Sequence, residues 1–204
     1  ADRIEELLDV LGVANFHGIA HDYGDTVAQE LLARRNEGTG AWGMISVCFL
    51  NGGLLPEAHR PRTIQKLLYG PLGPVVAKAM TRSQFARSLL AVFGPDTQPS
   101  DEEVDAFWSL IQHNQGRRVI PKLLGYMPER NQKRPRWVGA LQAARVPVGL
   151  INGSKDPVSG RHMVERYREV IRRNDFIEEF DEIGHYPQVE DPERVVDAWR
   201  SFLR

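Results

Sequence analysis

The chain has 204 residues, of which 42% are hydrophobic, and a formal net charge of -1. A chain of this length can bury a substantial core, and it suits one α/β domain with an insertion better than two independent domains. The stretch 129–137 is basic and the stretch 175–184 is acidic. Runs of this length are more often solvated loops or helix faces, so neither indicates binding to nucleic acid.

Nothing in the sequence indicates a membrane segment or a disulfide. The single cysteine, Cys48, has no internal partner and is expected to be a small buried side chain. No stretch approaches the ~18 apolar residues that cross a bilayer, and the acidic amphipathic start of the chain does not look like a signal peptide. We therefore expect no membrane segment in this chain and a cytoplasmic location. The oligomeric state stays unknown at this stage.

The first fifty residues alternate between helix and strand patterns. Apolar residues at helical spacing predict a helix at about 2–11, followed by Gly12. A short buried strand is expected over 13–21, a helix over 25–35 and a second strand over 44–51. Strand, helix and strand form a βαβ unit, which implies a parallel sheet.

The sequence pattern changes after residue 53. Residues 54–137 contain many prolines and helical patterns such as 101–112, which predict a mostly helical insertion. Strand, helix, strand and helix are then expected over 145–153, 160–173, 175–184 and 191–203. The predicted fold class is therefore α/β, mainly a parallel sheet, with core parts at 1–53 and 138–204 and a helical cap at 54–137.

Residues 20–24 (Ala-His-Asp-Tyr-Gly) place small residues on both sides of an aspartate at the end of the first strand. A tight strand-to-helix turn forces its central residue into a strained conformation and needs small flanking residues, which Ala20 and Gly24 supply. Asp22 would then project above the carboxyl edge of the sheet, ionised, beside the first amides of the helix. Taken alone, Asp22 fits an ordinary helix cap equally well.

Two later residues favour a catalytic interpretation. Asp156 comes just past the strand at 145–153, and His185 lies between the last strand and the last helix. Since the carboxyl ends of parallel strands meet at one edge of a sheet, both side chains can converge with Asp22. Separately, Asp156 also fits a turn before Pro157, and His185 an ordinary loop position. The order nucleophile, acid, histidine makes coincidence less plausible.

This pattern resembles the α/β-hydrolase superfamily, in the branch of haloalkane dehalogenases and epoxide hydrolases that use an aspartate nucleophile. The segments HDYGDTVAQELL, NGGLLPEAHRP, LLAVFGP, RWVGAL and HYPQVEDP are most similar to the mesoderm-specific transcript proteins, and they span nearly the whole chain from Asn15 onward. The resemblance implies Asp22 as nucleophile, His185 as base, Asp156 as the carboxylate that orients His185, and residues 54–137 as a cap over the pocket.

In this chemistry the aspartate attacks an electrophilic carbon and forms an ester, which water then hydrolyses. His185 would take the proton of that water, and Asp156 would hold the imidazole in the required tautomer. The expected substrate is a small, largely apolar molecule such as an epoxide or an alkyl halide. No cofactor is expected, and no metal, because the six histidines are scattered without ligand spacing.

The backbone N–H of Tyr23 is the first expected oxyanion donor. In the family the second donor comes from a loop upstream of the nucleophile, and the resemblance also implies several strands before the first one here. We therefore expect a partial α/β-hydrolase fold, part of a longer protein, that is catalytically impaired in isolation.

The residue after the nucleophile departs from the family pattern. The dehalogenases usually have a tryptophan there that helps to hold the departing halide, so Tyr23 favours an epoxide over an alkyl halide. Epoxide opening needs an acid in the cap, for which Tyr126 and Tyr69 are the candidates. Each of them also fits a packing aromatic. The alternative function is a non-catalytic protein that binds a ligand or a partner on the same fold.

Overall fold

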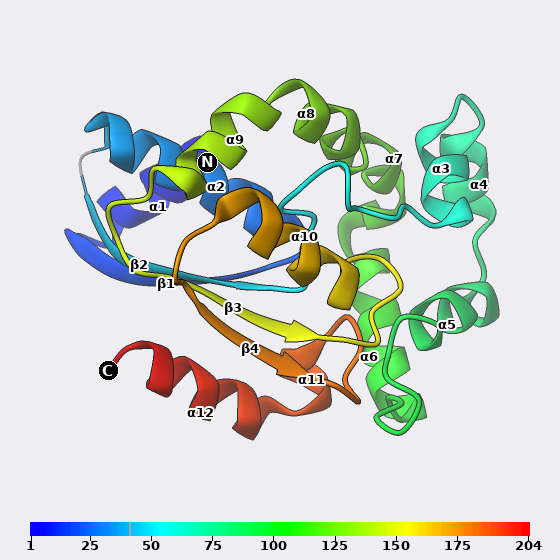
Figure 1. Ribbon diagram of the computed structural model, residues 1–204. Coiled ribbons are helices and arrows are strands. Elements are labelled where there is room, and N and C mark those ends of the chain that lie inside the picture. The colour runs from blue at the N-terminus through cyan, green and yellow to red at the C-terminus, as the bar shows by residue number, and fades with distance from the viewer. Residues whose placement is uncertain (41) are drawn as a thin grey trace.

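A four-stranded parallel sheet forms the centre of the computed structural model, which describes residues 1–40 and 42–204. The strands follow the order β1-β2-β3-β4 in space as in sequence (Figure 1). They comprise β1 (Asn15–His21), β2 (Gly43–Leu50), β3 (Val148–Gly153) and β4 (Phe176–Phe180). The predicted α/β class with a mainly parallel sheet is confirmed.

Helices cover both faces of this sheet (Figure 1). One face carries α2 (Tyr23–Glu37), α9 (Arg134–Gln142) and α10 (Arg161–Ile171), and the other carries α12 (Pro192–Phe202). The first helix, α1 (Asp2–Val10), lies beside β1, and α11 (Pro187–Glu190) is a single turn that the sequence analysis did not predict. The longer helices lie close to their predicted ranges, with ends that differ by one or two residues.

The central strand β2 is buried on both faces. Val47 and Phe49 pack with α2, α9 and α10, whereas Cys48 and Leu50 pack on the α12 side. This alternation follows from the two-residue period of a strand, and it explains why β2 reads as a continuous apolar run. Burying each of the larger side chains contributes about 1.5–3 kcal/mol. As expected, Cys48 is a small buried side chain.

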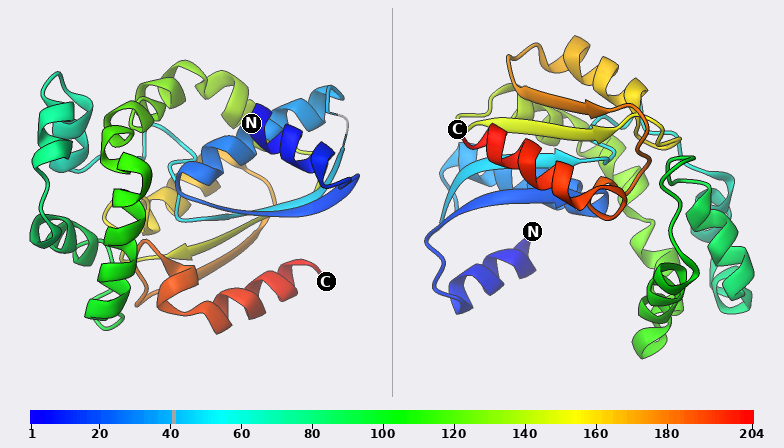
Figure 2. Two further views of the ribbon diagram at one scale, coloured as in Figure 1. Left: turned by 180° about the vertical axis from the view of Figure 1, so that it is seen from behind. Right: turned by 90° about the horizontal axis from the view of Figure 1, so that it is seen from below.

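The first strand is less buried than its sequence indicates. One face of β1 is open at alternate residues, and Ile19 is 48% exposed. The expectation of a buried strand is wrong for this face because α12 covers β3 and β4 instead (Figure 2). Among the described residues β1 pairs only with β2, so its other edge has no partner strand.

Between β2 and β3 the chain forms a group of helices that project beyond the carboxyl edge of the sheet (Figures 1 and 2). They are α3 (Thr63–Tyr69), α4 (Gly73–Ala79), α5 (Arg82–Leu90), α6 (Asp101–Gln112), the 3-10 helix His113–Arg118, α7 (Ile120–Leu123) and α8 (Tyr126–Gln132). The chain then returns to the sheet through α9. The helical character predicted for 54–137 is thus found, while its division into domains stays a prediction.

The cap helix α6 begins where its sequence predicts. The Ser100 hydroxyl accepts from the Glu103 amide at 3.2 Å, and the Glu103 carboxylate accepts from the Ser100 amide at 2.8 Å. Such a reciprocal capping box satisfies two backbone donors that the first turn leaves free. None of the helices in the described ranges combines the length and apolar character needed to span a bilayer.

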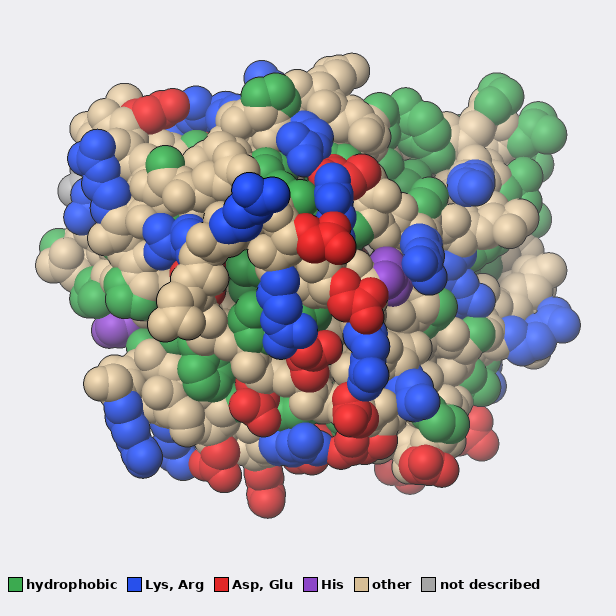
Figure 3. All heavy atoms as spheres, viewed as in Figure 1, with side chains coloured by type: hydrophobic (Ala, Val, Ile, Leu, Met, Phe, Trp, Pro, Cys, Tyr) green, Lys and Arg blue, Asp and Glu red, His purple; other side chains and the backbone are tan. Residues whose placement is uncertain are grey.

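Acidic and basic side chains alternate over the face formed by α10, α12 and the end of β4 (Figure 3). Ion pairs join several of them, including Arg161 with Asp181 at 2.5 Å and Arg168 with Glu179 at 2.9 Å. Exposed pairs of this kind contribute little stability each, about 0.2–1 kcal/mol.

Candidate active site

Asp22 occupies a strained corner between β1 and α2. Its backbone has φ 50° and ψ -105°, a conformation that costs about 1–3 kcal/mol for a residue other than glycine. The flanking small residues are close together, since a Cβ added to Gly24 would lie 3.8 Å from that of Ala20. The Asp22 carboxylate makes no capping hydrogen bond to α2. The ordinary helix cap is therefore not what the structure shows.

The structure brings His185 and Asp156 to this corner. His185 Nδ1 lies 2.8 Å from Asp156 Oδ2, and His185 Nε2 lies 3.9 Å from Asp22 Oδ2. The first distance is a hydrogen bond, and the second is too long for one but short enough for strong charge interaction. The Asp156 side chain is buried, whereas the Asp22 side chain remains 35% exposed. The three side chains therefore converge at the carboxyl edge of the sheet.

Asp156 is held by five donors. Its Oδ1 accepts from the Val158 amide, and its Oδ2 accepts from the amide and hydroxyl of Ser159, from His185 and from Asn51 Nδ2. Its partners thus include both the backbone amides of a turn and the imidazole of His185. A carboxylate fixed by so many donors presents its charge to the imidazole in one defined position.

Asn51 links the end of β2 to the end of β3 next to the Asp156 carboxylate. Its amide accepts from the Gly153 N–H at 2.7 Å and donates to the Gly153 carbonyl at 3.0 Å, besides its bond to Asp156 at 3.1 Å. Its backbone has φ 32°, another left-handed conformation at the same edge of the sheet. A neutral amide at this position supports Asp156, rather than a residue after β2, as the carboxylate beside the imidazole.

Glu190, which the sequence analysis did not single out, organises the loop that carries His185. Its carboxylate accepts from the amides of Gly184 and Tyr186, and also from the amide of Gly94 in the cap. The His185 amide in turn donates to the carbonyl of Val92 at 2.8 Å. These bonds join the histidine loop to the cap segment after α5.

The charges of the three residues stabilise one another. Burial disfavours the charged imidazole, but the carboxylates of Asp156 and Asp22 outweigh burial and raise the pKa of His185 to about 10. Burial likewise favours the neutral acid at Asp22, and the neighbouring imidazole and then Arg130 reverse this, so the pKa of Asp22 is lowered. At neutral pH the site therefore holds an imidazolium between two carboxylates.

Aromatic side chains surround this ion cluster. The Tyr186 ring meets the His185 ring edge-on at 4.9 Å and lies 5.1 Å from His21. His21 Nε2 lies 2.7 Å from the His185 carbonyl, so this nitrogen carries the proton and donates. Burial, followed by the charge of His185, lowers the pKa of His21. His21 is therefore a neutral support for the backbone of the histidine loop.

The candidate tyrosines lie in different places. Tyr126, at the start of α8, is buried with its ring centre 5.3 Å from that of Tyr23, and burial together with the charge of Asp22 raises its pKa to about 12. Tyr69 is the last residue of α3 and is 49% exposed, and α3 lies at the outer side of the cap, away from the sheet (Figure 1). Tyr23 is the first residue of α2, where backbone N–H groups have no intrahelical acceptor. Its amide can therefore serve an oxyanion.

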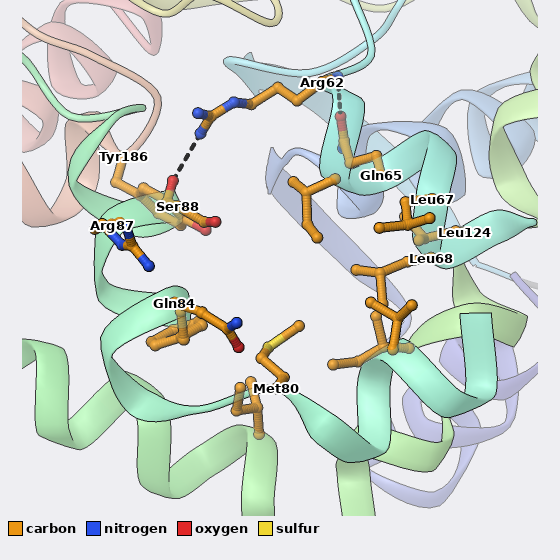
Figure 4. Close-up of a pocket in the computed structure, with 15 residues that line it drawn as sticks. Arg62, Gln65, Leu67, Leu68, Met80, Gln84, Arg87, Ser88, Leu124 and Tyr186 are labelled. Carbon is orange, nitrogen blue, oxygen red and sulfur yellow. Dashed lines mark hydrogen bonds between the residues drawn. The ribbon is translucent and has the colours of Figure 1, made fainter. Parts of the chain in front are cut away.

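A cavity of about 720 Å³ opens within the cap next to this cluster. Apolar side chains of α3, α4, α5 and α7 line it, and Arg62 and Gln65 stand at its upper rim (Figure 4). Tyr186 both lines this cavity and contacts the ring of His185. Such a chamber suits an apolar molecule better than a highly charged one.

One prediction about the basic stretch 129–137 is wrong in part. Arg134 and Arg136 do lie at the surface, where they pair with glutamates. Arg130, however, is 2% exposed and points under the corner that carries Asp22. Its burial depends on contacts with residues far away along the chain, so a single-sequence reading of local charge cannot find it.

The fold and the arrangement of these residues define an α/β hydrolase. Residues 1–198 match the model of the alpha/beta hydrolase family, and the chain belongs to that family. The whole chain is 41% identical to the mesoderm-specific transcript protein of Mus musculus and 42% identical to its Homo sapiens homolog. It spans 62% of the length of each of these relatives. Among solved structures, 2-hydroxy-6-oxo-6-phenylhexa-2,4-dienoate hydrolase of Rhodococcus sp. strain RHA1 superposes with a TM-score of 0.73 at 14% identity, over 97% of this chain and 67% of that one.

Proposed function

We propose that the protein hydrolyses a small, largely apolar electrophile, an epoxide in the first instance, through an ester formed on Asp22. The observation that carries this proposal is the convergence of a strained, partly exposed carboxylate with a buried imidazole and its orienting carboxylate. An ionised aspartate is a ready nucleophile, and the lowered pKa of Asp22 supports that state at neutral pH.

In the first step an Asp22 oxygen attacks a ring carbon of the epoxide. The carbon–oxygen bond of the ring breaks, and the released oxygen takes a proton from Tyr126, which leaves a hydroxyalkyl ester on Asp22. In the second step His185 takes a proton from water as the oxygen of that water attacks the ester carbonyl. The bond between the carbonyl carbon and the alkyl oxygen of the ester breaks, the leaving oxygen takes the second proton of the attacking water, and the diol departs, while one water oxygen stays in the carboxylate of Asp22. Tyr126 regains its proton from solvent, to which His185 released one after the ester formed.

Esterification also prepares His185 for its role as a base. An imidazolium with a pKa of about 10 cannot accept a proton at neutral pH. The ester removes the negative charge of Asp22, 3.9 Å from Nε2, and so lowers the affinity of the imidazole for its proton. The base is therefore generated by the first step, when it is needed.

The experiment uses the full-length protein. The His185→Gln variant is incubated with styrene oxide, and the intact mass and peptide map are measured. An adduct with the mass of one epoxide on Asp22 is expected, and Asp22→Asn, the matched control, should form none. In a single turnover of the unmodified protein in H₂¹⁸O, the label should enter Asp22.

The alternative is a protein that binds a ligand on this fold without turnover. It predicts that styrene oxide leaves no adduct on Asp22 and that no ¹⁸O enters the carboxylate. That result would refute the proposed function. A haloalkane such as 1-bromobutane, tested beside styrene oxide, distinguishes the two electrophile classes through bromide release.

A further inference from the structure

An arginine of the cap lies under the corner that carries Asp22. Arg130 belongs to α8, and its side chain is among the largest that are fully buried. It is 108 residues from Asp22 along the chain. A buried guanidinium keeps its charge and costs free energy unless it is well bonded, so its position requires a physical reason.

The guanidinium bonds the backbone of the corner itself. Arg130 Nη2 donates to the Asp22 carbonyl at 3.0 Å, and Arg130 Nε donates to the Thr26 hydroxyl at 2.6 Å. Its central carbon also lies 4.4 Å from the centre of the Tyr126 ring. The same fork thus contacts the strained residue, the first turn of α2 and the proposed acid.

Two consecutive glycines leave room for the side chains of Arg130 and Asp25 at this point. A Cβ added to Gly53 would lie 2.1 Å from Arg130 Nη1, and one added to Gly52 would lie 2.1 Å from Asp25 Oδ2. Among the described residues neither Arg130 Nη1 nor the Asp25 carboxylate has a hydrogen-bond partner. Arg130 and Asp25 lie beyond ion-pair distance, and the charge of Arg130 opposes, without outweighing, the burial that raises the pKa of Asp25.

We propose that Arg130 is a positioning residue for the nucleophile: its guanidinium holds the Asp22 carbonyl and the Thr26 hydroxyl, and thereby fixes the strained corner to the cap. This inference rests on the proposed function for its catalytic consequence. It differs from that function in naming a cap residue that touches no reacting atom and acts through the backbone of Asp22.

Two substitutions separate the geometry of Arg130 from its charge. Arg130→Lys keeps a positive charge but loses the planar fork that reaches two acceptors at once. Arg130→Met keeps a similar length and loses both. If the fork positions Asp22, the lysine variant is expected to form the ester about 10- to 100-fold more slowly, with little change in KM. The methionine variant should be slower still.

A pH profile tests whether the effect goes beyond stability. The charge of Arg130 favours the ionised form of Asp22, so the acid limb of ester formation should move to higher pH in Arg130→Met but not in Arg130→Lys. A purely structural role would leave both profiles unchanged for the folded molecules. The matched control is Arg134, which lies at the surface of α9 and pairs with Glu57 at 2.5 Å. Arg134→Lys and Arg134→Met should leave the rate of ester formation unchanged.

Hydrogen exchange of the peptide that contains residues 20–27 gives a readout independent of catalysis. Its amides should exchange at least about tenfold faster in Arg130→Lys than in the unmodified complete protein, because one backbone anchor is weakened. If the unmodified protein forms no ester with styrene oxide, the proposed function fails and the exchange measurement alone decides on Arg130. Unchanged exchange, or ester formation in Arg130→Lys within twofold of the unmodified rate, would overturn this inference. If Arg130→Met does not fold, the rate of ester formation and the hydrogen exchange of Arg130→Lys test the inference.

Discussion

Removing the charge of Asp22 is expected to lower the pKa of His185. The substitution is Asp22→Asn, which keeps the size of the side chain and, like the proposed ester, carries no charge. His185 would then retain Asp156 as its carboxylate neighbour, 2.8 Å from Nδ1. With one carboxylate fewer beside the imidazole, the pKa of His185 should fall.

The size of the fall can be worked out from the distance. A unit charge 3.9 Å away contributes about 4 kcal/mol at an effective dielectric constant of about 20. That energy corresponds to about three pH units. The Asp22 side chain is 35% exposed, and solvent screening reduces its contribution. We therefore expect the titration midpoint of His185 to fall by about one to three pH units.

The measurement is a pH titration of the imidazole nitrogens by NMR in the unmodified and Asp22→Asn proteins. His185→Gln identifies the resonances. The neighbouring His21 and His59 interfere little, because burial lowers the pKa of both, for His59 to about 4. Asp181→Asn, an exposed aspartate that pairs with Arg161, is the control and should leave the midpoint in place. A midpoint that moves by less than half a pH unit in Asp22→Asn would refute the reasoning that esterification generates the base.

Three stability predictions follow from the same region. Burial raises the pKa of Asp25, so the folded state binds a proton that the unfolded state has released, and stability is lost as pH rises above the ordinary aspartate range. Asp25→Asn should therefore have a higher melting temperature than the unmodified protein at pH 8 but not at pH 4. The gain in the free energy of unfolding should be about 1.4 kcal/mol for each pH unit by which the pKa of Asp25 in the folded state exceeds that in the unfolded state. A difference independent of pH contradicts this. Asn51→Ala leaves a buried backbone donor at the end of β3 unpaired and should cost about 1–3 kcal/mol in a denaturant titration; a loss below about 0.5 kcal/mol would show that water replaces the amide. Gly53→Ala would place a methyl group 2.1 Å from Arg130 Nη1 and should lower the melting temperature, whereas Gly139→Ala, with no atom within 4 Å, should not; equal melting temperatures for the two variants would disprove the close packing.

Local sequence patterns predict the elements of this fold well where a local cause exists. The helix at 101–112 agrees with its prediction because a capping box fixes its start. The convergence of Asp22, Asp156 and His185 is also predictable, since each follows the carboxyl end of a parallel strand. These two inferences need only the period of the pattern and the direction of the strands.

Contacts between distant segments could not be predicted in the same way. The single turn α11 escaped notice, and so did the role of its Glu190, whose carboxylate accepts from three backbone amides. The exposed face of β1 also differs from expectation, because an apolar run does not say whether a helix covers it. In each case the contact that determines the structure is made by a residue or helix far away in the sequence.

The balance of charge links these features of the site. In the free state two ionised carboxylates, Asp22 and Asp156, lie near two cations, His185 and Arg130. Burial raises the pKa of Asp25 and so favours its neutral form, which adds no third negative charge. In the proposed reaction Asp22 becomes an ester and loses its negative charge, so the imidazole of His185 holds its proton less tightly and can release it. An ionised Asp25 would oppose that release, since it would restore the missing negative charge beside the imidazole. The burial of Asp25 therefore favours the step proposed for His185, its conversion into a base after the ester has formed.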